Sequence, residues 1–312
     1  MAEPARGGRP KRERFTVTVD GRDLEVSNLD KLMYPAAGFT KGEVIDYYTR
    51  IAPVLLPHLR DRAVTRIRFP NGVEGAHFFE KNKPGGTPDW VRLETLPVPG
   101  STKSRETIDF VVVDDLPTLV WLANLAAIEL HTPQWRIGAD PDLMVVDLDP
   151  GAPAGLKECC AVATLMRDRL AEDGIDAYPK TSGKKGMQLC CPVSGTQNAE
   201  VVSAYAKKVA DELAALVPGS ITAKMAKAIR PGKIFIDWSQ NNAAKTTVTP
   251  YSLRAGERPT GSAPLTWDEV IAMATGEMAA RQFGAGEVLE RAEQHGDLLA
   301  DLLHHGPAVP TV

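Results

Sequence analysis

The sequence predicts an α/β fold of the α+β kind, in which helices flank mixed or antiparallel sheets. Helical and strand patterns alternate irregularly along the 312 residues, without the strict β-α-β rhythm of a doubly wound parallel sheet. Hydrophobic residues make up 43% of the chain and charged residues 24%, which is typical of a globular protein. We find no internal repeat. We expect one domain over residues 15–300, between a basic tail at 1–14 and a C-terminal tail at 301–312.

The predicted helices are supported by capping and punctuation signals. Thr40 and Glu43 form a capping-box pattern at the start of "TKGEVIDYYTRIAPVLLPHL". The run "LPTLVWLANLAAIELH" has Pro117 near its first turn and predicts a helix that carries His131 at its C-terminal end. Further helices are expected at about 155–173, ending at Gly174, near 199–216, and in the acidic tail from about 266.

The predicted strands are short apolar runs bounded by turn residues. "AVTRIRFPNG" and "AHFFEKN" are expected to lie on either side of a turn at Asn71–Gly72. "IDAYPKTSGKKGMQLCCPV" predicts two strands around a Gly- and Lys-rich turn. Further predicted strands are "ETIDFVVVDD", "LMVVDLDPG", "KIFIDWS" and "KTTVTPYS".

Charge is distributed unevenly although the net charge is only −4. Residues 1–14 carry five basic and two acidic groups, and their Arg, Gly and Pro content predicts disorder. Residues 221–258 carry seven basic and two acidic groups, whereas residues 259–312 carry two basic and eight acidic groups. A basic segment within an acidic protein indicates a local anion-binding site rather than a generally basic surface.

The cysteines and the hydropathy pattern exclude several classes of protein. The four cysteines occur as the adjacent pairs Cys159–Cys160 and Cys190–Cys191, so no CxxC spacing supports a zinc site. We expect buried thiols in a reducing, cytoplasmic compartment. The sequence shows no run long enough for a membrane span and no secretory signal, so no membrane partner is expected.

The stretch "LMVVDLDPG" ends an apolar strand with Asp147 and Asp149. Residues i and i+2 of a strand share a face, so the two carboxylates project to the same side. Two like charges this close need compensation, and a divalent cation with oxygen ligands is the usual partner. The alternative is a polar strand end followed by a turn at Pro150–Gly151.

Asp237 ends a second apolar strand in "KIFIDWSQN" and is a candidate third metal ligand. Taken alone, Asp237 is more often an isolated residue at a strand end. Four basic residues flank it in the sequence: Arg230, Lys233, Lys245 and Arg254. Carboxylates surrounded by cations are the arrangement that phosphoryl chemistry requires.

Two further features fit a phosphate-binding site. In "KTSGKKGMQL", Ser182 and Lys185 bracket a glycine turn that can bring backbone N–H groups close to a phosphate, although the P-loop pattern is absent and a solvated lysine turn would look the same. His131 lies sixteen residues before Asp147, although a single histidine at a helix end is more often a structural cap. Together these features predict nucleotidyl transfer, with two metal ions activating a primer 3′-hydroxyl and binding the triphosphate.

Phe78 and Phe79 in "AHFFEKN" could form a stacking platform for nucleic-acid bases. The alternative, from strand alternation, is that one ring belongs to the core and the other lies at a strand edge.

The sequence resembles the polymerase domain of bacterial ligase D, the non-homologous end-joining repair polymerase of the archaeo-eukaryotic primase superfamily. The resemblance covers roughly residues 15–300, and it implies a primase-type catalytic core. The stretches that carry it are "LDKLMYP", "TKGEVIDYY", "TRIRFPNGV", "FFEKN", "LAAIELHTPQW", "VVDLDPG", "TSGKKGMQL", "IRPGKIFIDWSQN", "KTTVTPYSLR" and "HGDLL".

The resemblance implies a role for each matching residue. Asp147, Asp149 and Asp237 would bind two Mn²⁺ or Mg²⁺ ions and form the catalytic triad. The implied triphosphate contacts are His131, Ser182, Lys185 and Arg254. Arg230 would orient the acid cluster, Gln240 would sense the incoming sugar or base, and Phe79 would stack on the nucleotide. The implied DNA contacts are Phe78 on the template, Arg68 near the primer terminus, and Lys31 and Lys41 on a downstream 5′-phosphate.

The implied partners are DNA with a gap or break, a ribo- or deoxyribonucleoside triphosphate, and Ku with a DNA ligase. One departure is Ile67, where relatives can carry a basic residue in "TRIRFP". The sequence shows no Lys-x-Asp-Gly ligase motif and no His-rich phosphoesterase segment, as expected for an excised domain or a stand-alone relative. Three alternatives are a haloacid-dehalogenase-type phosphatase, a manganese D-x-D glycosyltransferase and a non-catalytic module that binds 5′-phosphorylated DNA ends.

Overall fold

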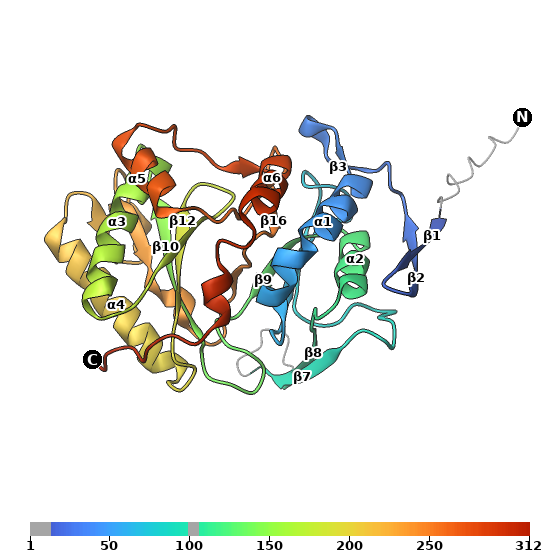
Figure 1. Ribbon diagram of the computed structural model, residues 1–312, viewed down its shortest axis with the longest axis horizontal. Helices are drawn as coiled ribbons and strands as arrows, with labels where there is room; N and C mark the ends of the chain where they lie inside the picture. The colour runs from blue at the N-terminus through green and yellow to red at the C-terminus, as the bar shows by residue number, and fades with distance from the viewer. Residues whose placement is uncertain (1–13, 99–105) are drawn as a thin grey trace, which may run out of the picture.

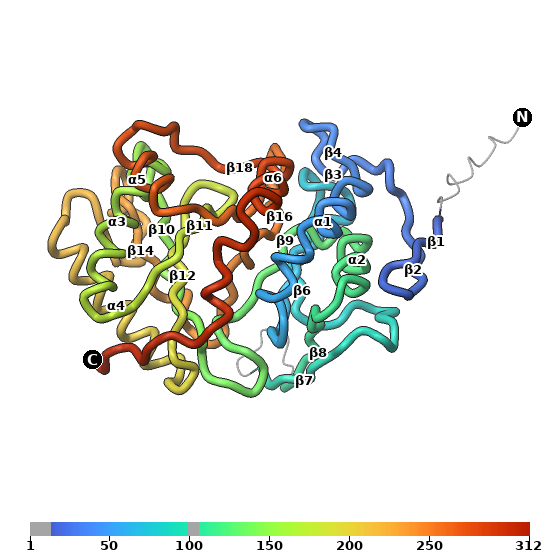
Figure 2. The backbone as a smooth tube through the Cα atoms, viewed as in Figure 1, coloured from blue at the N-terminus to red at the C-terminus, as the bar shows by residue number. Residues whose placement is uncertain are grey.

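Two β-sheets, each covered by helices, form the body of the protein (Figure 1). The structure, a computed structural model, describes residues 14–98 and 106–312. The N-terminal part of the chain builds the half on the right of Figure 2, the middle builds the half on the left, and the segment after α6 runs back across to the left. The predicted α/β class with flanking helices is confirmed.

The first sheet has five strands in the order β11-β12-β10-β14-β13. Only the pair β13 and β14 is parallel, so the sheet is mixed. Helices α3 (Leu156–Glu172) and α4 (Ala199–Leu216) pack against it, and α5 (Trp267–Thr275) packs against α3. Its strands are β10 (Leu143–Pro150), β11 (Tyr178–Thr181), β12 (Met187–Pro192), β13 (Ile221–Thr222) and β14 (Ile234–Asp237).

The second sheet has four strands in the order β15-β9-β5-β6, with β6 at one edge. Helix α2 (Leu116–Asn124) packs against β9, and the long helix α1 (Lys41–Leu59) packs against α2 (Figure 1). Its strands are β5 (Thr65–Arg68), β6 (Phe78–Glu80), β9 (Ala127–Thr132) and β15 (Thr247–Val248).

Smaller elements complete the described chain. The paired strands are β1 (Arg14–Val19) with β2 (Arg22–Ser27), β3 (Leu32–Tyr34) with β4 (Phe39–Thr40), and β7 (Leu93–Pro97) with β8 (Thr107–Val111). A three-stranded sheet contains β16 (Leu253–Arg254), β17 (Thr260–Gly261) and β18 (Phe283–Gly284). The remaining helices are α6 (Ala285–His295) and the 3₁₀ turns η1 (Pro35–Ala37), η2 (Lys227–Ile229), η3 (Trp238–Asn241) and η4 (Ala300–Leu303).

Local signals explain where several helices begin. The Thr40 side chain accepts from the Glu43 N–H, and the Glu43 carboxylate accepts from the Thr40 N–H, so the predicted capping box forms at α1. Asn198 caps α4 by accepting from the Val201 N–H. The predicted helices at 40–59, 155–173 and 199–216 are therefore confirmed to within a residue or two.

The prediction that a helix carries His131 at its end is wrong. Helix α2 ends at Asn124, Ala126 takes a positive φ of 60°, and His131 lies on strand β9. The run contains good helix formers, but residues 127–131 pair with β5, and this pairing outweighs local propensity. Strands β5 and β6 do pair antiparallel, although residues 69–77, with Gly72 at a φ of 82°, connect them instead of a two-residue turn.

The predicted tails at residues 1–14 and 301–312 can be compared with the structure only in part. Residues 1–13 lie outside the described residues, and Arg14 already belongs to β1. Near the other end, Val309 is buried, and its backbone exchanges two hydrogen bonds with the Gln197 side chain. The division at residues 15 and 300 stays a prediction.

The core confirms the expected state of the cysteines, which are all buried and free. One face of β10 contributes Met144, Val146 and Leu148 to the main core beneath α3.

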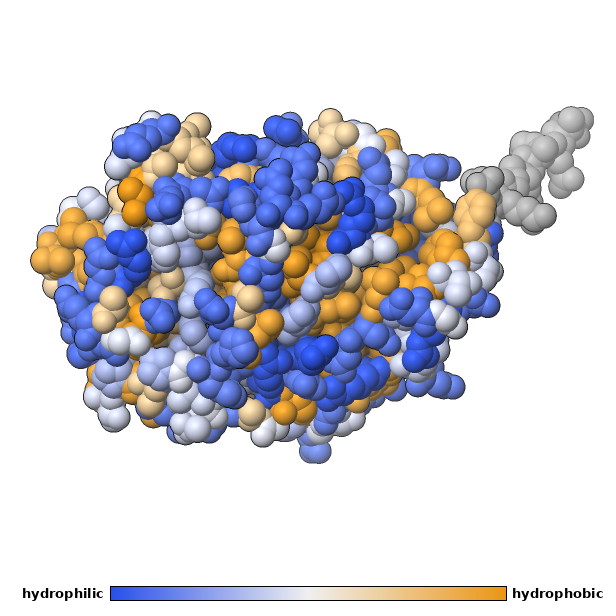
Figure 3. Space-filling view, viewed as in Figure 1, coloured by the Kyte–Doolittle hydropathy of each residue, from blue (hydrophilic) through white to orange (hydrophobic). Residues whose placement is uncertain are grey.

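No helix among residues 14–98 and 106–312 is long and apolar enough to cross a membrane. The face in Figure 3 shows hydrophobic residues in small patches among hydrophilic ones.

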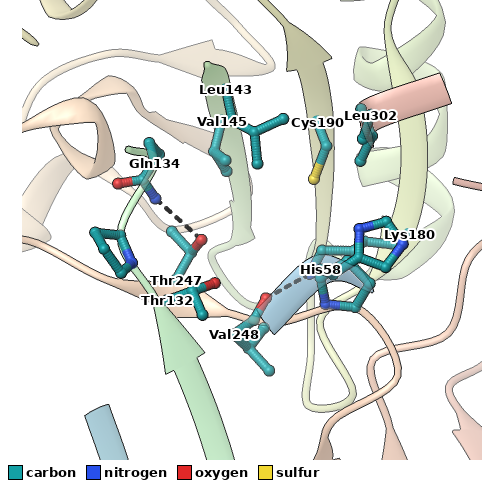
Figure 4. Close-up of a pocket in the computed structure, with 12 residues that line it drawn as sticks. His58, Thr132, Gln134, Leu143, Val145, Lys180, Cys190, Thr247, Val248 and Leu302 are labelled. Atoms are coloured by element: carbon teal, nitrogen blue, oxygen red, sulfur yellow. Dashed lines mark hydrogen bonds between the residues drawn. The ribbon is translucent and has the colours of Figure 1, made fainter. Parts of the chain in front are cut away.

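A small cavity lies between the two sheets (Figure 4). Its walls come from both sheets, and Lys180 of β11 reaches across to donate a 3.0 Å hydrogen bond to the carbonyl oxygen of Val248 on β15. The ammonium also donates to Ser262 Oγ at 2.8 Å. Lys180 is 1% exposed, and burial lowers its pKa from 10.5 to about 8. This lysine therefore links the sheets at a cost in desolvation.

We expect the stability of the wild type to rise relative to that of Lys180→Met between pH 8 and about 10. Below pH 8 both folded and unfolded chains carry the lysine proton, and the burial cost is complete. Above pH 8 the folded state releases the proton first, so this group adds about 1.4 kcal/mol per pH unit until both states are neutral. Urea unfolding of both proteins at pH 7.5, 8.5 and 9.5 measures the difference. Parallel pH dependences would contradict the assignment.

Candidate active site

A row of polar side chains crosses four adjacent strands of the five-stranded sheet. In register, Lys180 of β11 lies opposite Gln188 of β12, Gln188 lies opposite Asp147 of β10, and Asp147 lies opposite Asp237 of β14. Residues directly opposite each other in antiparallel strands share a face of the sheet. Asp149, two residues after Asp147, shares this face too. The three predicted acidic residues therefore meet on one side of the sheet.

Hydrogen bonds connect one end of this row to the carboxylates. Lys180 Nζ donates to Gln188 Oε1 at 2.7 Å, and Gln188 Nε2 donates to Asp147 Oδ1 at 3.2 Å. The lysine fixes which end of the amide is the acceptor, so the NH₂ group of Gln188 faces Asp147. Sequence reasoning missed both Lys180 and Gln188, because only the strand register reveals them.

Asp237 is held at the other end of the row by the turn that follows it. Its Oδ1 accepts hydrogen bonds from the backbone N–H of Ser239 at 3.0 Å and from Ser239 Oγ at 2.5 Å. Its Oδ2 accepts from Gln240 Nε2 at 2.7 Å. Lys245 Nζ in turn donates to Ser239 Oγ. Two predicted site residues, Gln240 and Lys245, thus lie beside the acidic cluster.

The three carboxylates repel one another. Burial, together with the charges of Asp149 and Asp237, raises the pKa of Asp147 to about 7. Burial and Asp237 also raise the pKa of Asp149, while Arg230 opposes this shift. Asp149 is exposed, Asp147 is half-buried and Asp237 is buried, so the cluster opens to solvent at Asp149. The charged forms of Asp147 and Asp149 are therefore disfavoured at this site.

The donor chemistry of the cluster fits a hard divalent cation, which prefers carboxylate oxygens. A bound cation would also relieve the repulsion that raises the pKa of Asp147. Within the described parts of the chain, however, no three His, Cys, Asp or Glu side chains are arranged to hold a metal ion. Both carboxylate oxygens of Asp237 accept hydrogen bonds, from Ser239 and Gln240.

Arg230 lies beside Asp149 through a close backbone contact. The Gly151 N–H donates to the Lys233 carbonyl at 2.8 Å, and the Gly232 N–H donates back to the Gly151 carbonyl at 2.8 Å. A Cβ atom on Gly151 would overlap with the carbonyl oxygen of Arg230. The guanidinium of Arg230 lies 3.5 Å from the ring centroid of Phe235. The glycine after β10 therefore lets the arginine segment approach the acids.

A second group of charges gathers around β9, where His131, Lys184 and Arg254 surround the carboxylate of Glu129. The glycine turn that carries Ser182 packs on Arg254, because a Cβ on Gly183 would lie 2.5 Å from Arg254 Cγ. Predicted contacts His131, Ser182 and Arg254 are thus brought together. Lys185, in the same turn, is exposed and extends to solvent.

The aromatic pair lies on edge strand β6, with Phe78 52% and Phe79 58% exposed. Neither ring belongs to the core, so the alternative in which one of them is buried is wrong. Phe79, Ile67 and Glu129 are in register across β6, β5 and β9, so Phe79 shares a face with the β9 charges. Phe78 lies opposite Arg68 on the other face, and Arg68 is paired with Glu80 at 3.0 Å.

Lys31 and Lys41 are neighbours at the N-terminus of α1, where the Lys41 N–H donates to the Lys31 carbonyl at 2.8 Å. Lys31 Nζ donates to the Pro70 carbonyl and to Asn71 Oδ1, and Lys41 Nζ donates to the Ser27 carbonyl and Asn124 Oδ1. Burial and Lys31 lower the pKa of Lys41 to about 8. In the part of the chain that the structure describes, neither ammonium pairs with a carboxylate.

Comparisons with known proteins agree on one family. The model of the LigD primase-polymerase domain matches residues 40–299. The chain is 41% identical to the multifunctional non-homologous end joining protein LigD of Mycolicibacterium smegmatis over 284 residues, 89% of this chain and 36% of that protein. It is 33% identical to the bifunctional non-homologous end joining protein LigD of Bacillus subtilis over 275 residues, 88% of this chain and 43% of that protein.

A solved structure agrees with this similarity. The polymerase domain from Mycobacterium tuberculosis ligase D, in complex with DNA, is 38% identical and superposes with a TM-score of 0.84. The match covers 90% of this chain and 98% of that one. The chain thus spans well under half the length of the curated relatives, but nearly the whole of a solved polymerase domain.

Gly151→Ala should destabilise the protein by about 1–3 kcal/mol, because the added methyl group overlaps with backbone that cannot rotate away. Gly219→Ala is the matched control, since nothing lies within 4 Å of a Cβ there and its φ is not positive. Urea unfolding of the two variants measures the difference. Equal stability of the two would show that the Arg230 segment does not depend on this contact.

Proposed function

This chain belongs to the LigD primase-polymerase domain family, and on that premise we propose that it is a template-directed nucleotidyltransferase of non-homologous end joining. It adds ribo- or deoxyribonucleotides to a primer 3′ end at gaps and double-strand breaks. The observation that carries the proposal is the strand register that places Asp237 opposite Asp147, with Asp149 on the same face.

In this proposal the three carboxylates hold two divalent cations, Mn²⁺ or Mg²⁺. Bound cations of this kind lower the pKa of a primer 3′-hydroxyl and stabilise a leaving pyrophosphate. Asp149 offers the exposed oxygens, while Gln188 keeps Asp147 oriented through its amide. Asp237, which now accepts hydrogen bonds from Ser239 and Gln240, would be the third residue to hold the cations, and the Gln240 amide would contact the incoming sugar or base. Arg230 balances the charge beside Asp149.

The nucleotide lies between the two charge clusters. His131, Ser182, Lys185 and Arg254 bind the triphosphate, and the exposed Lys185 is free to close on it. Support comes from Lys180, whose charge interacts with both Asp147 and Arg254 and so lies between the clusters. Phe79 shares a face of the four-stranded sheet with Glu129, which suits stacking on the incoming base.

The DNA lies across the edge strand and the N-terminus of α1. Phe78 stacks on the template, and Arg68, on the same face, places the primer terminus. Lys31 and Lys41 bind the downstream 5′-phosphate. In the described residues neither ammonium pairs with a carboxylate, and Lys41 is the first residue of α1. The solved relative is a polymerase domain in complex with DNA, which supports DNA binding by this chain.

A DNA ligase and Ku are the proposed partner proteins. The relatives are named as multifunctional or bifunctional non-homologous end joining proteins, which supports a role for this chain in end joining. A D-x-D glycosyltransferase would leave Asp237 without a role, and a non-catalytic end-binding module would leave all three carboxylates without one. No observation favours either alternative, or a dehalogenase-type phosphatase.

Asp149→Ala should lower primer extension by about 100-fold or more, because it removes the solvent-facing charge of the metal-binding cluster. The assay uses a labelled, gapped duplex with a 5′-phosphate, each nucleoside triphosphate in turn, and Mn²⁺ or Mg²⁺. Asp211→Ala, an exposed aspartate of α4 paired only with Lys207, is the control and should retain activity. Equal extension by the two variants, or none by wild type, would contradict the mechanism.

Lys31→Ala should weaken binding to a gapped duplex several-fold only when the downstream end carries a 5′-phosphate. The reason is that a terminal phosphate carries more charge than a diester, and Lys31 is the more accessible ammonium of the pair. Fluorescence anisotropy with phosphorylated and unphosphorylated duplexes measures this at fixed salt. Lys157→Ala, which removes an exposed charge from α3, is the control. Equal losses of affinity for both duplexes would contradict the assignment of Lys31 to the downstream 5′-phosphate.

A further inference from the structure

Glu129 of β9 is a buried carboxylate whose partners include two permanent cations, Lys184 and Arg254. It is 1% exposed, yet its two oxygens have four partners. Oε2 lies 2.9 Å from His131 Nε2 and 3.3 Å from Arg254 Nε. Oε1 lies 3.0 Å from Lys184 Nζ and accepts a 3.0 Å hydrogen bond from the Ala255 N–H. One buried group therefore connects its own strand with two segments that are distant in the sequence.

The electrostatics keep this carboxylate charged. Although burial raises the pKa of Glu129, the hydrogen bond with His131 and the charges of Arg254, His131 and Lys184 lower it to about 2. Two permanent cations, Lys184 and Arg254, share this one anion. Without Glu129 the two cations would repel each other, and their geometry would no longer be fixed.

The contacts of Glu129 hold backbone segments in place as well as side chains. The Ala255 N–H holds the residue directly after Arg254, and Lys184 belongs to the turn of Ser182. That turn is already pressed against Arg254 at Gly183, whose carbonyl accepts from Thr260 Oγ1. The carboxylate thus ties the glycine turn, β9 and the β16 segment into one unit.

We propose that Glu129 is the positioning residue of the triphosphate site. It orients His131 and Arg254 and holds the Lys184 turn, so that their remaining donors converge on phosphate. This inference rests on the proposed function of these residues in binding a nucleoside triphosphate. Because its own carboxylate is buried, Glu129 acts through its partners and does not touch the substrate.

Glu129→Gln tests the role, since it keeps the volume and the acceptor oxygen but removes the charge. We expect the KM for the nucleoside triphosphate to rise about tenfold, with kcat reduced much less and the KM for the gapped DNA unchanged. Inorganic tripolyphosphate, as a competitive inhibitor, should lose affinity by a similar factor. This second readout reports the phosphate site without the base or sugar.

Glu269→Gln is the matched control. Glu269 is also a partly buried glutamate paired with an arginine, Arg291, but it lies on α5 away from the β9 charges. A variant that merely loses a structural ion pair should resemble this control, with lower stability and an unchanged nucleotide KM.

A nucleotide KM and a tripolyphosphate inhibition within twofold of wild type in Glu129→Gln would overturn the inference, while extension by wild type would leave the polymerase proposal intact. If Glu129→Gln does not fold, Lys184→Met provides the test, because this half-exposed lysine can be replaced at little cost to folding. We expect its nucleotide KM to rise about threefold. An unchanged KM would likewise overturn the inference.

Discussion

The register of β10 against its two neighbours is the constraint on which the rest of the site depends. A shift of one residue would turn Asp147 and Asp149 into the core beneath α3 and bring Val146 and Leu148 to the open face. The burial of Met144, Val146 and Leu148 therefore fixes the acids on the opposite side. The hydrophobic core and the polar row are two consequences of one strand alternation, so the forces that fold the sheet also assemble the carboxylates.

The charge clusters around Asp147 and around Glu129 are opposite in kind: the first gathers carboxylates, and the second gathers basic side chains around one carboxylate. Around Asp147, burial and two neighbouring carboxylates disfavour the charged form, and a bound cation, as proposed, would relieve this cost. Around Glu129, cations accumulate, and one carboxylate prevents their mutual repulsion. Lys180 lies between the clusters and contacts both sheets. A carboxylate cluster beside a cluster with two permanent cations suits the proposed substrate, a nucleoside triphosphate with bound divalent cations.

Sequence reasoning succeeded where chemistry and periodicity are local. The capping box at Thr40, the span of α4 and the shared face of Asp147 and Asp149 all follow from neighbours in the chain. It failed at His131, because strand pairing with β5 overrides helix-forming residues. A strand predicted over "IELH" would have placed the side chains of Glu129 and His131 on the same face of that strand. Gln188 and Lys180 required the cross-strand register, which no local pattern contains.

Strand β6 shows how the molecule exposes two large aromatic rings on a sheet edge. An open edge invites pairing with another chain, and long apolar edges promote aggregation. Here the strand is only three residues long, and Glu80 and Lys81 follow the rings immediately with charge. The brevity of β6 limits intermolecular sheet growth while both rings remain in water. Because neither ring packs in the interior, the side chains at positions 78 and 79 can differ between sequences without destabilising the fold.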